Sequence, residues 1–380
     1  MEPDSPQILY LNTAAGDRIQ AMTLAGIRRY AGALGWEVRS VPWQESRPED
    51  IAPLLGAHRP VAGCVVECSD GNSHLPPRLF GRVPVVYLHA APSLYGGRIV
   101  RVSADNEAVA RAAFRELSAG HPTAFAAVGV ITDYSWSRER VRRFRALCAE
   151  TGKHCLVFDR PGETPTARIR RLPGWVAGLP NHCAVFAAND FAAADVVTAA
   201  RAAGRAIPRN LTLLGVDNNA SLCEASRPSI TSIQLDHERA GFLAARMIGE
   251  RAASASVGPL LAVRRESTRG HGRREPFVLK AVEAIRREAC DGLTPATLAA
   301  RFPGSRRLFD IRFREATGHS VLDEILHIRL ERVMVLLSRP DFPIDAIADF
   351  SGFGCRYGLR KLFRARYGVS MCQWRKDNAR

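Results

Sequence analysis

Short apolar runs alternate with amphipathic segments over the first two-thirds of the chain. The run QILYLN at 7–12 precedes a segment, 17–36, in which Ile19, Ile27 and Tyr30 recur with a helical period. Runs of the first kind predict buried strands, and segments of the second kind predict helices with one apolar face. Further strands are predicted at 36–42, 61–67, 83–89, 99–105, 123–130, 154–159, 183–190 and 211–217. Further helices are predicted at 48–57, 106–118, 136–151, 191–203 and 236–251.

This alternation predicts parallel sheets that are covered by helices on both faces. It forms two comparable blocks, so we expect an α/β domain of two doubly wound lobes. Ligands of such sheets bind beyond the carboxyl ends of the strands. The polar residues at those positions are therefore candidates for a binding site, namely Asp17 and Arg18 after the first strand, and Asn189 and Asp217 at the ends of two later strands.

The pattern changes near residue 268. The stretch from Glu266 is polar, charged and rich in glycine, which is typical of a linker. From Phe277 onward only helices are predicted, at 277–290, 294–301, 305–317, 321–338, 344–350, 355–367 and 371–376. We therefore divide the chain into an α/β domain at 1–268, a linker at 269–276 and an all-α domain at 277–380.

Two stretches of the all-α domain, 294–317 and 344–367, share one pattern. Each has a short apolar helix, a break and a longer, Arg-rich helix, as in a helix-turn-helix unit whose second helix exposes one face to the major groove of DNA. In the first unit Leu308, Phe309 and Phe313 are expected to point inward or to flank the core. The residues expected to face DNA are Arg306, Arg307 and Asp310 in the first unit and Arg356, Tyr357, Arg360 and Lys361 in the second.

A long apolar helix at 321–338 separates the two units and is expected to pack against both. Such a helix would fix the two recognition helices relative to each other. If they lie about one turn of B-DNA apart, roughly 34 Å, a single subunit can read two successive major grooves.

Charge adds only weak support for a nucleic-acid partner. The 380-residue chain has a formal net charge of +15, which favours polyanions. The basic excess is, however, spread over both halves of the chain. An isolated basic helix is more often a solvated face than a DNA reader, so the prediction depends on the matched pair of units.

The sequence does not predict an enzyme, a metal-binding protein or a membrane protein. The sequence contains no Walker A motif, no nucleophile elbow and no GxGxxG after a strand, so no enzyme and no cofactor are expected. The nine Cys form no CxxC pair, and no metal site is expected; they are predicted to be buried, reduced thiols. No leader or membrane span is apparent, which suggests the reducing cytoplasm and association with the nucleoid.

The all-α domain resembles the DNA-binding domain of the AraC/XylS family. The resemblance covers 277–376 and is most specific in IDAIADFSGFGCRYGLRKLFRARYG, followed by SMCQWR. Three residues depart from the family pattern. Pro303 stands where the first turn usually has Gly, Gly358 where an aromatic residue is common, and Met371 where Pro is common.

The α/β domain resembles the sensor core of LacI/GalR regulators and periplasmic binding proteins. The resemblance lies in GHPTAFAAVG, in the stretch from AANDF to LLGVDN, and in PSITSIQLDHERAG. It implies that Arg140, Asn189 and Asp217 contact a sugar, with Asp17 and Arg18 as weaker candidates. Trp136 could supply a flat apolar wall for one face of the sugar. Asn189 and Asp217 could instead cap helices, and Asp190 is expected to cap the helix that begins after it.

A sensor core followed by an AraC-type tail resembles the xylose-operon regulator type over essentially the whole chain. The resemblance implies a homodimeric transcription regulator that activates sugar catabolism genes, with double-stranded DNA, RNA polymerase and a pentose such as D-xylose as partners. One alternative is a different carbohydrate or a sugar acid as effector. Another, of a different class, is a soluble solute-binding protein whose helical tail makes protein contacts.

Overall fold

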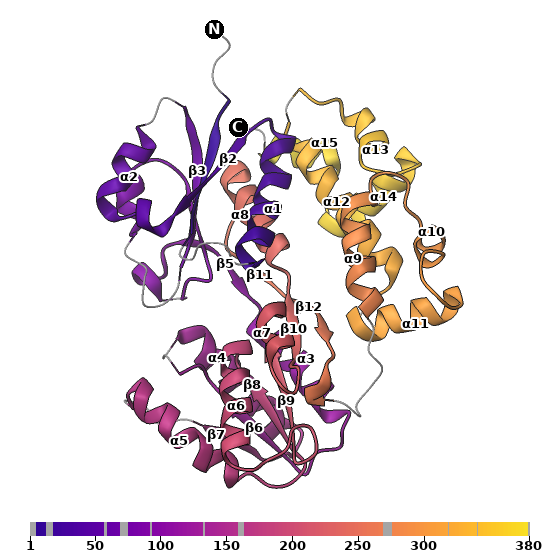
Figure 1. Cartoon of the computed structure of the whole chain (residues 1–380). Helices are drawn as coiled ribbons and strands as arrows, with labels where there is room; N and C mark the ends of the chain where they lie inside the picture. Colours follow the sequence, from indigo (N-terminus) through magenta and orange to yellow (C-terminus); the bar gives the residue numbers. More distant parts are fainter. Residues whose placement is uncertain are drawn as a thin grey trace.

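The chain forms two α/β lobes, one above the other, with a helical domain beside them (Figure 1). The computed structural model describes residues 5–378 except 13–17, 57–58, 69–74, 92, 132–133, 159–162, 269–275, 318 and 340. No helix in this part of the chain is long and apolar enough to cross a membrane.

The first lobe is built on a six-stranded sheet with the strand order β11-β5-β4-β3-β1-β2, in which all neighbouring strands are parallel. Its strands are β1 (Gln7–Asn12), β2 (Glu37–Pro42), β3 (Val61–Glu67), β4 (Val85–Leu88), β5 (Val100–Ala104) and β11 (Ala255–Val257). Its helices are α1 (Arg18–Ala33), α2 (Pro48–Leu55) and α8 (His237–Glu250), with 3-10 turns η1 (Trp43–Glu45), η2 (Pro77–Phe80) and η3 (Leu94–Gly97). Separate apolar clusters fill the two faces of the sheet, as expected of a doubly wound lobe.

The second lobe has a six-stranded sheet with the order β12-β10-β9-β8-β6-β7, and only β12 runs antiparallel to its neighbour. Its strands are β6 (Ala124–Val128), β7 (Cys155–Phe158), β8 (Cys183–Ala187), β9 (Leu211–Val216), β10 (Thr231–Leu235) and β12 (Pro259–Val263). Its helices are α3 (Asn106–Ser118), α4 (Ser135–Glu150), α5 (Pro165–Ala177), α6 (Asp190–Ala202) and α7 (Ala220–Ala225), followed by η4 (Glu266–Thr268).

The chain crosses between the lobes three times. It passes from β5 to α3, from β10 to α8, and from β11 to β12. Asp105, His237 and Ser256 lie at these three crossings and line the same cavity. The connections between the lobes therefore form one wall of the space in which a ligand would be enclosed.

Helices α1 and α8 are in backbone contact in the first lobe. A Cβ atom at Gly26 would overlap the backbone of Glu238, and one at Gly241 would overlap the backbone of Thr23. Glycine at these two positions therefore allows an approach that no larger residue permits, and α1 and α8 are held tightly together.

After Thr268 the described chain contains only helices and turns, as predicted. The helices are α9 (Pro276–Glu288), α10 (Pro295–Ala299), α11 (Arg306–Thr317), α12 (Val321–Leu337), η5 (Ile344–Ala346), α13 (Ile347–Phe350), α14 (Arg356–Tyr367) and α15 (Met371–Asn378). Thr294 and Ser320 begin α10 and α12 with capping boxes, which satisfy free backbone N–H groups at the helix starts. The predicted linker, 269–276, lies almost entirely outside the described residues.

Helix α12 packs against both helix-turn-helix units, as the apolar pattern indicates. Its first half, including Ile325, shares a core with α9, α10 and α11. Its second half, including Val333, shares a second core with α13, α14 and α15. Each unit is therefore anchored to the same helix.

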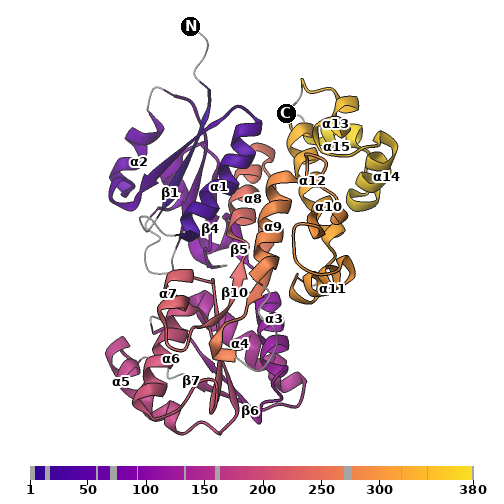
Figure 2. The same cartoon turned by 45° about the vertical axis from the view of Figure 1, so that its right-hand side comes forward.

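The helical domain also packs on both lobes of the sensor. Leu260 and Leu261 of β12 belong to the core of the first helix-turn-helix unit, and Val335 of α12 belongs to the core of the first lobe. Figure 2 shows α9 and α12 beside α8. A change in the angle between the lobes would therefore act on this interface.

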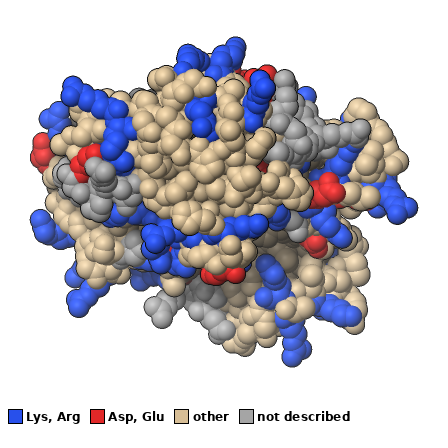
Figure 3. Space-filling model, turned by 90° about the horizontal axis from the view of Figure 1, so that it is seen from below, with Lys and Arg blue, Asp and Glu red and all other residues tan. Residues whose placement is uncertain are grey.

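Basic side chains are not confined to the helical domain. Figure 3 shows the end of the molecule that carries the second lobe, where Lys and Arg lie mainly around a central region of other residues and few Asp or Glu are in view. All nine Cys are free thiols, but Cys355 and Cys372 are exposed rather than buried as predicted.

Candidate functional site

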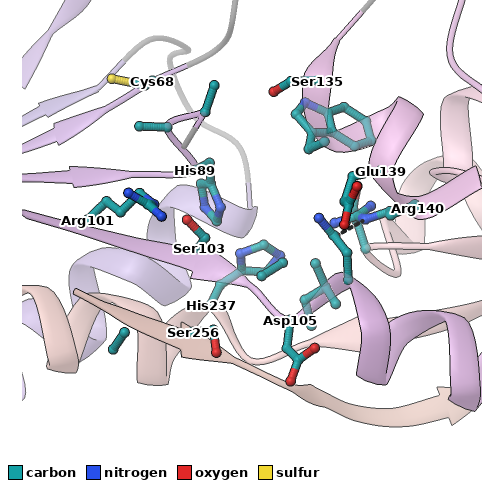
Figure 4. A pocket seen from close by; sticks show the side chains of 18 of the residues that line it. Cys68, His89, Arg101, Ser103, Asp105, Ser135, Glu139, Arg140, His237 and Ser256 are labelled. Carbon is teal, nitrogen blue, oxygen red and sulfur yellow. Dashed lines mark hydrogen bonds and ion pairs between the residues drawn. The ribbon is translucent and has the colours of Figure 1, made fainter. Parts of the chain in front are cut away.

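A cavity of about 780 Å³ lies between the two lobes. Glu67, His89, Arg101 and His237 line it from the first lobe and its connections. Trp136, Glu139, Arg140 and Asp217 line it from the second lobe. Figure 4 shows Arg101, His89 and His237 on one side, with Glu139 and Arg140 of α4 on the other.

Arg140 is the most constrained polar residue of the cavity. Its side chain is 4% exposed, its Nη1 donates to Ala188 O at 2.7 Å, and its Nε donates to Asn106 Oδ1 at 3.1 Å. The same Nη1 lies 3.6 Å from Asp217 Oδ1. Burial lowers the pKa of Arg140, and the Asp217 carboxylate opposes that shift. The guanidinium is thus held in one orientation, with Asp217 beside it.

Asp217 projects from the end of β9 through an uncommon backbone conformation. Its φ is 97°, a region that favours glycine, and its N–H donates to Ile233 O at 2.8 Å. The next residue, Asn218, is fixed by hydrogen bonds to Ser232, Gln234 and Arg265. Strain at a site that is otherwise well anchored is typical of functional positions.

Trp136 lines the cavity from the start of α4. The Arg140 guanidinium lies over its ring at 4.8 Å from the centroid, and Tyr134 stacks on it at 5.7 Å with an interplanar angle of 15°. These two contacts hold the ring in position at the cavity.

Asn189 has the capping role that was its alternative to a sugar contact, and Asp190 does not have the role predicted for it. Asn189 Oδ1 accepts a hydrogen bond from Ala192 N at 2.9 Å and caps α6, and Asn189 does not line the cavity. The expectation that Asp190 is the cap is wrong. Its carboxylate instead accepts from Asn219 N at 2.7 Å, and burial, with the nearby Asp217 carboxylate, raises its pKa to about 7.

The two weaker candidates cannot be placed. Asp17 lies outside the described residues, and Arg18 is the first residue of α1 but its side chain is not described. Ile19 and Gln20, the next residues of α1, do line the cavity. The start of α1 therefore borders the candidate site.

His89, His237 and Glu67 also line the cavity but were not predicted, although two of them follow strands. Glu67 ends β3 and His89 directly follows β4, so both stand at the carboxyl ends of strands. Burial lowers the pKa of His89 to about 3, and the neighbouring His237 adds to the shift. The two rings meet edge to face at 5.7 Å. His89 is therefore neutral at pH 7 and can both donate and accept a hydrogen bond.

These groups suit a small, uncharged molecule with several hydroxyl groups. Carboxylates such as Asp217 accept hydrogen bonds from hydroxyls, the Arg140 guanidinium donates to them, and the Trp136 ring covers an apolar face. The described residues contain no cluster of His, Cys, Asp and Glu that could hold a metal ion.

The predicted DNA-facing residues lie at the surface of the helical domain. In α11, Arg306 and Arg307 are exposed and Asp310 is partly covered. The four predicted residues of α14 are all exposed, and Tyr357 is 76% exposed. Phe309 and Phe313 are buried as expected, but Leu308 is 39% exposed. The second unit offers the larger basic face.

Pairs with acidic residues orient two arginines of α14. Arg360 Nη2 lies 2.7 Å from Asp345, and Arg356 Nη2 lies 3.2 Å from Asp349. Both carboxylates belong to the preceding helical turns, η5 and α13. Lys361 has no ion pair among the described residues.

Glycine residues with positive φ form the turn of each unit. Gly304 has φ 108°, so the first turn has its glycine one position after Pro303. Gly352 has φ 77°, and a Cβ there would lie 2.8 Å from the Cα of Cys290. Gly358 fits differently, because a Cβ would meet only Cys355 Cβ at 3.9 Å, so the fold leaves room for a side chain there.

A cluster of ion pairs joins the sensor to the helical domain. Arg286 of α9 lies 2.6 Å from Asp236 and 3.0 Å from Glu238, at the start of α8. Arg29 of α1 bridges Glu238 at 3.0 Å and Glu331 of α12 at 2.7 Å. We call these five residues the interface cluster. Two of them, Asp236 and Glu238, flank His237, which lines the cavity, so the start of α8 contacts both the cavity and the helical domain.

Two family models match parts of the chain. The periplasmic binding protein-like domain matches residues 102–268, and the helix-turn-helix domain matches residues 298–377. The chain therefore joins a periplasmic-binding-protein-like domain to a helix-turn-helix domain, and these matches support an AraC-family regulator with a sensor of that fold. This regulator is similar to transcription regulators rather than to enzymes, in agreement with the sequence analysis.

Curated relatives are similar to most of the chain. The xylose operon regulatory protein of Escherichia coli strain K12 is 24% identical over 290 residues, which cover 73% of this regulator and 74% of that protein. The protein of the same name from Haemophilus influenzae is 23% identical over 288 residues, covering 72% and 74%.

Solved structures share the fold. A structure described as that of the xylose-binding transcription activator xylR covers 98% of this regulator and 99% of its own chain, with 21% identity and a TM-score of 0.56. The lac repressor dimer bound to operator covers 70% of this regulator and 82% of its own chain, with 17% identity and a TM-score of 0.54.

Proposed function

We propose that this regulator binds a small sugar, a pentose such as D-xylose, between its two lobes and activates transcription of sugar catabolism genes as a homodimer. The observation that carries the proposal is the cavity in which buried Arg140, Asp217 and the Trp136 ring meet. The relatives named for the xylose operon favour a pentose as the effector. A different carbohydrate or a sugar acid is the alternative.

The proposal assigns sugar contacts to Arg140, Asp217 and Trp136. Asn189 becomes a supporting residue, because its side-chain oxygen caps α6 outside the cavity. His89 and His237 join the set from the opposite wall. A sugar held by both walls would favour the closed arrangement of the lobes, since only that arrangement satisfies both sets of contacts.

Operator recognition is assigned to α11 and α14. Their exposed arginines, with Tyr357 and Lys361, face away from the core that α12 supplies. Bases can be read by such side chains in the major groove, and phosphates can be contacted by the same cations.

Coupling between the sugar site and the helical domain is assigned to the start of α8. His237 lines the cavity, whereas Asp236 and Glu238 pair with Arg286 of the helical domain. A shift of His237 on sugar binding would move both carboxylates and so change the position of α9 and α12. Such a change would alter which half-sites the paired domains of a dimer engage together.

A thermal-shift panel tests the choice of effector. D-xylose, L-arabinose, D-ribose, D-glucose and D-xylonate would each be added to the full chain, and the expected result is the largest rise in Tm with a pentose. A larger rise in Tm with a hexose or with xylonate would identify that class of molecule, rather than a pentose, as the effector. No rise with any of them would refute a sugar site between the lobes.

A further inference from the structure

A second cavity, of about 440 Å³, lies on the other side of α4 from the proposed sugar site. Trp136, Glu139 and Arg140 face the first cavity, whereas Val141 and Arg142 line the second. The ends of β6 and β7 and the first turn of α5 complete it, with Val130, Phe158 and Arg168. It therefore stands at the carboxyl ends of parallel strands, where doubly wound sheets bind ligands.

The walls of this second cavity combine positive charge with an apolar floor. Four arginines line it, and none of its described lining residues is acidic. Val130, Val141, Val157 and Phe158 supply apolar surface. Such a lining fits a ligand that has a negatively charged group and an apolar body.

Arg168 is the residue that points to a ligand. It is 7% exposed, its Nε is buried without a hydrogen-bond partner, and it forms no ion pair with any described residue. Its Nη2 would lie 3.9 Å from a Cβ at Gly129, at the end of β6. A buried charge without a partner is costly, so an opposite charge is expected to bind beside it.

Two nearby arginines, in contrast, have an acidic partner. Arg171, one turn further along α5, is paired with Glu163 at 2.8 Å and lies over the Phe158 ring. Arg142 is paired with Glu139 at 2.8 Å. The second cavity therefore contains one buried guanidinium whose charge no described carboxylate balances.

We propose that the second cavity binds a small organic anion, whose carboxylate or phosphate pairs with Arg168 and whose apolar body lies on Val141, Val157 and Phe158. A guanidinium can donate two parallel hydrogen bonds to either group. The inference does not depend on the proposed sugar, because it concerns a separate cavity. Helix α4 borders both cavities.

Calorimetry on the full chain at constant ionic strength tests the proposal with phenyl phosphate, benzoate and inorganic phosphate as probes. The variants are Arg168→Met and, as a matched control, Arg170→Met, which removes an exposed arginine from the same helix. We expect phenyl phosphate or benzoate to bind to the natural protein and to Arg170→Met. Affinity should fall at least tenfold in Arg168→Met. The preferred probe identifies the charged group, and a preference over inorganic phosphate identifies the apolar contact.

A second readout separates a ligand site from a structural role. If Arg168 serves to bind an anion, Arg168→Met should raise the Tm of the ligand-free protein, because an unbalanced buried charge is removed. Ala146→Trp, at the rim of the cavity, should block the probes while leaving Arg168 in place. The proposal is overturned if no probe binds, if binding persists in Arg168→Met or Ala146→Trp, or if Arg168→Met lowers the Tm.

Discussion

At the level of single residues, the site depends on side chains that are each held in one conformation. Arg140 is buried, donates to two fixed acceptors and lies over Trp136, so its free donors can face only the cavity. Asp217 reaches the cavity because β9 ends in a backbone conformation with positive φ. Orientation that is fixed before the ligand arrives reduces the entropy lost on binding.

Replacing Asp217 by Asn tests this arrangement with little change in shape, since Asn tolerates positive φ. The variant loses a charged acceptor for sugar hydroxyls, and such hydrogen bonds contribute about 1.5–3 kcal/mol. We expect the Kd for the effector to rise about tenfold or more in calorimetry. The Tm of the free protein should fall, because the buried Arg140 guanidinium loses the carboxylate beside it. An unchanged Kd would remove Asp217 from the site.

Asp190 predicts a pH dependence of stability. Its pKa is raised to about 7 in the folded protein, chiefly by burial, from an ordinary value of 3.8. The folded state therefore keeps a proton that the unfolded chain loses between pH 4 and 7. The stability contributed by this proton is fully present below pH 4 and is lost as the pH rises to about 7.

Urea unfolding of the natural protein and of Asp190→Asn at several pH values checks this sign. The free energy of unfolding of the variant, relative to the natural protein, should increase from pH 4 to 7 and stay level above it. Asp291→Asn, at an exposed position, serves as the control and should show no such increase. A flat difference for Asp190→Asn would contradict the raised pKa.

Two of the residues predicted from the sequence, Asp217 and Arg140, line the cavity. Each is marked in the sequence, Asp217 by the end of a strand and Arg140 by a family motif. Asp190 was given the capping role that Asn189 has, because the sequence does not reveal which of two adjacent polar side chains turns toward the helix start. His237 was missed because nothing local distinguishes it, and only the crossing between the lobes brings it to the cavity.

At the scale of elements, the long alternating segments were predictable and the short or interrupted ones were not. Helix α5 contains Pro173 and Gly174, which ordinarily signal a break, but packing of Leu172 and Val176 in the lobe core retains the helix. Strands β11 and β12 are short pieces that form only because each pairs with a strand of its lobe. Their register depends on tertiary contacts that local sequence does not specify.

Helix α14 yields a prediction about DNA binding. Lys361 is exposed and has no ion pair among the described residues, while Arg356 is already paired with Asp349. Lys361→Ala should therefore weaken operator binding and lower the salt dependence by about one phosphate contact, a change of about 0.9 in the slope of log K against log salt. Arg356→Ala should also weaken binding.

Sugar affinity provides the control for both variants. It should be unchanged, because α14 has no residue in the cavity between the lobes. Loss of sugar binding in either variant would contradict the division into a sensor and a DNA-binding domain. Full operator affinity in both would remove the exposed face of α14 from the contact with DNA.

At the scale of the whole molecule, the interface cluster is where the sensor meets the helical domain. Glu238 of α8 pairs with Arg29 and Arg286, and its neighbour His237 lines the cavity. The helical domain rests on both lobes, through Leu260 of β12 and Val335 of α12. Movement of one lobe against the other must therefore change at least one of these contacts.

Glu238→Gln weakens the interface cluster without a change in side-chain size. We expect sugar affinity to remain within about twofold of the natural protein while the effect of sugar on operator affinity decreases severalfold. Glu283→Gln, an exposed change on α9, is the matched control and should preserve the full response. An undiminished response in Glu238→Gln would place the coupling elsewhere.

A sugar bound between the lobes is proposed to change how the two helix-turn-helix units engage DNA. Quantitative footprinting of the operator, with the natural protein and with Asp217→Asn, measures this directly when it is done with and without saturating D-xylose. We expect the sugar to change the affinity or the extent of the footprint for the natural protein, and we expect Asp217→Asn to need at least tenfold more sugar for the same change. If saturating sugar binds but leaves both the affinity and the footprint of the natural protein unchanged, the proposed coupling is contradicted.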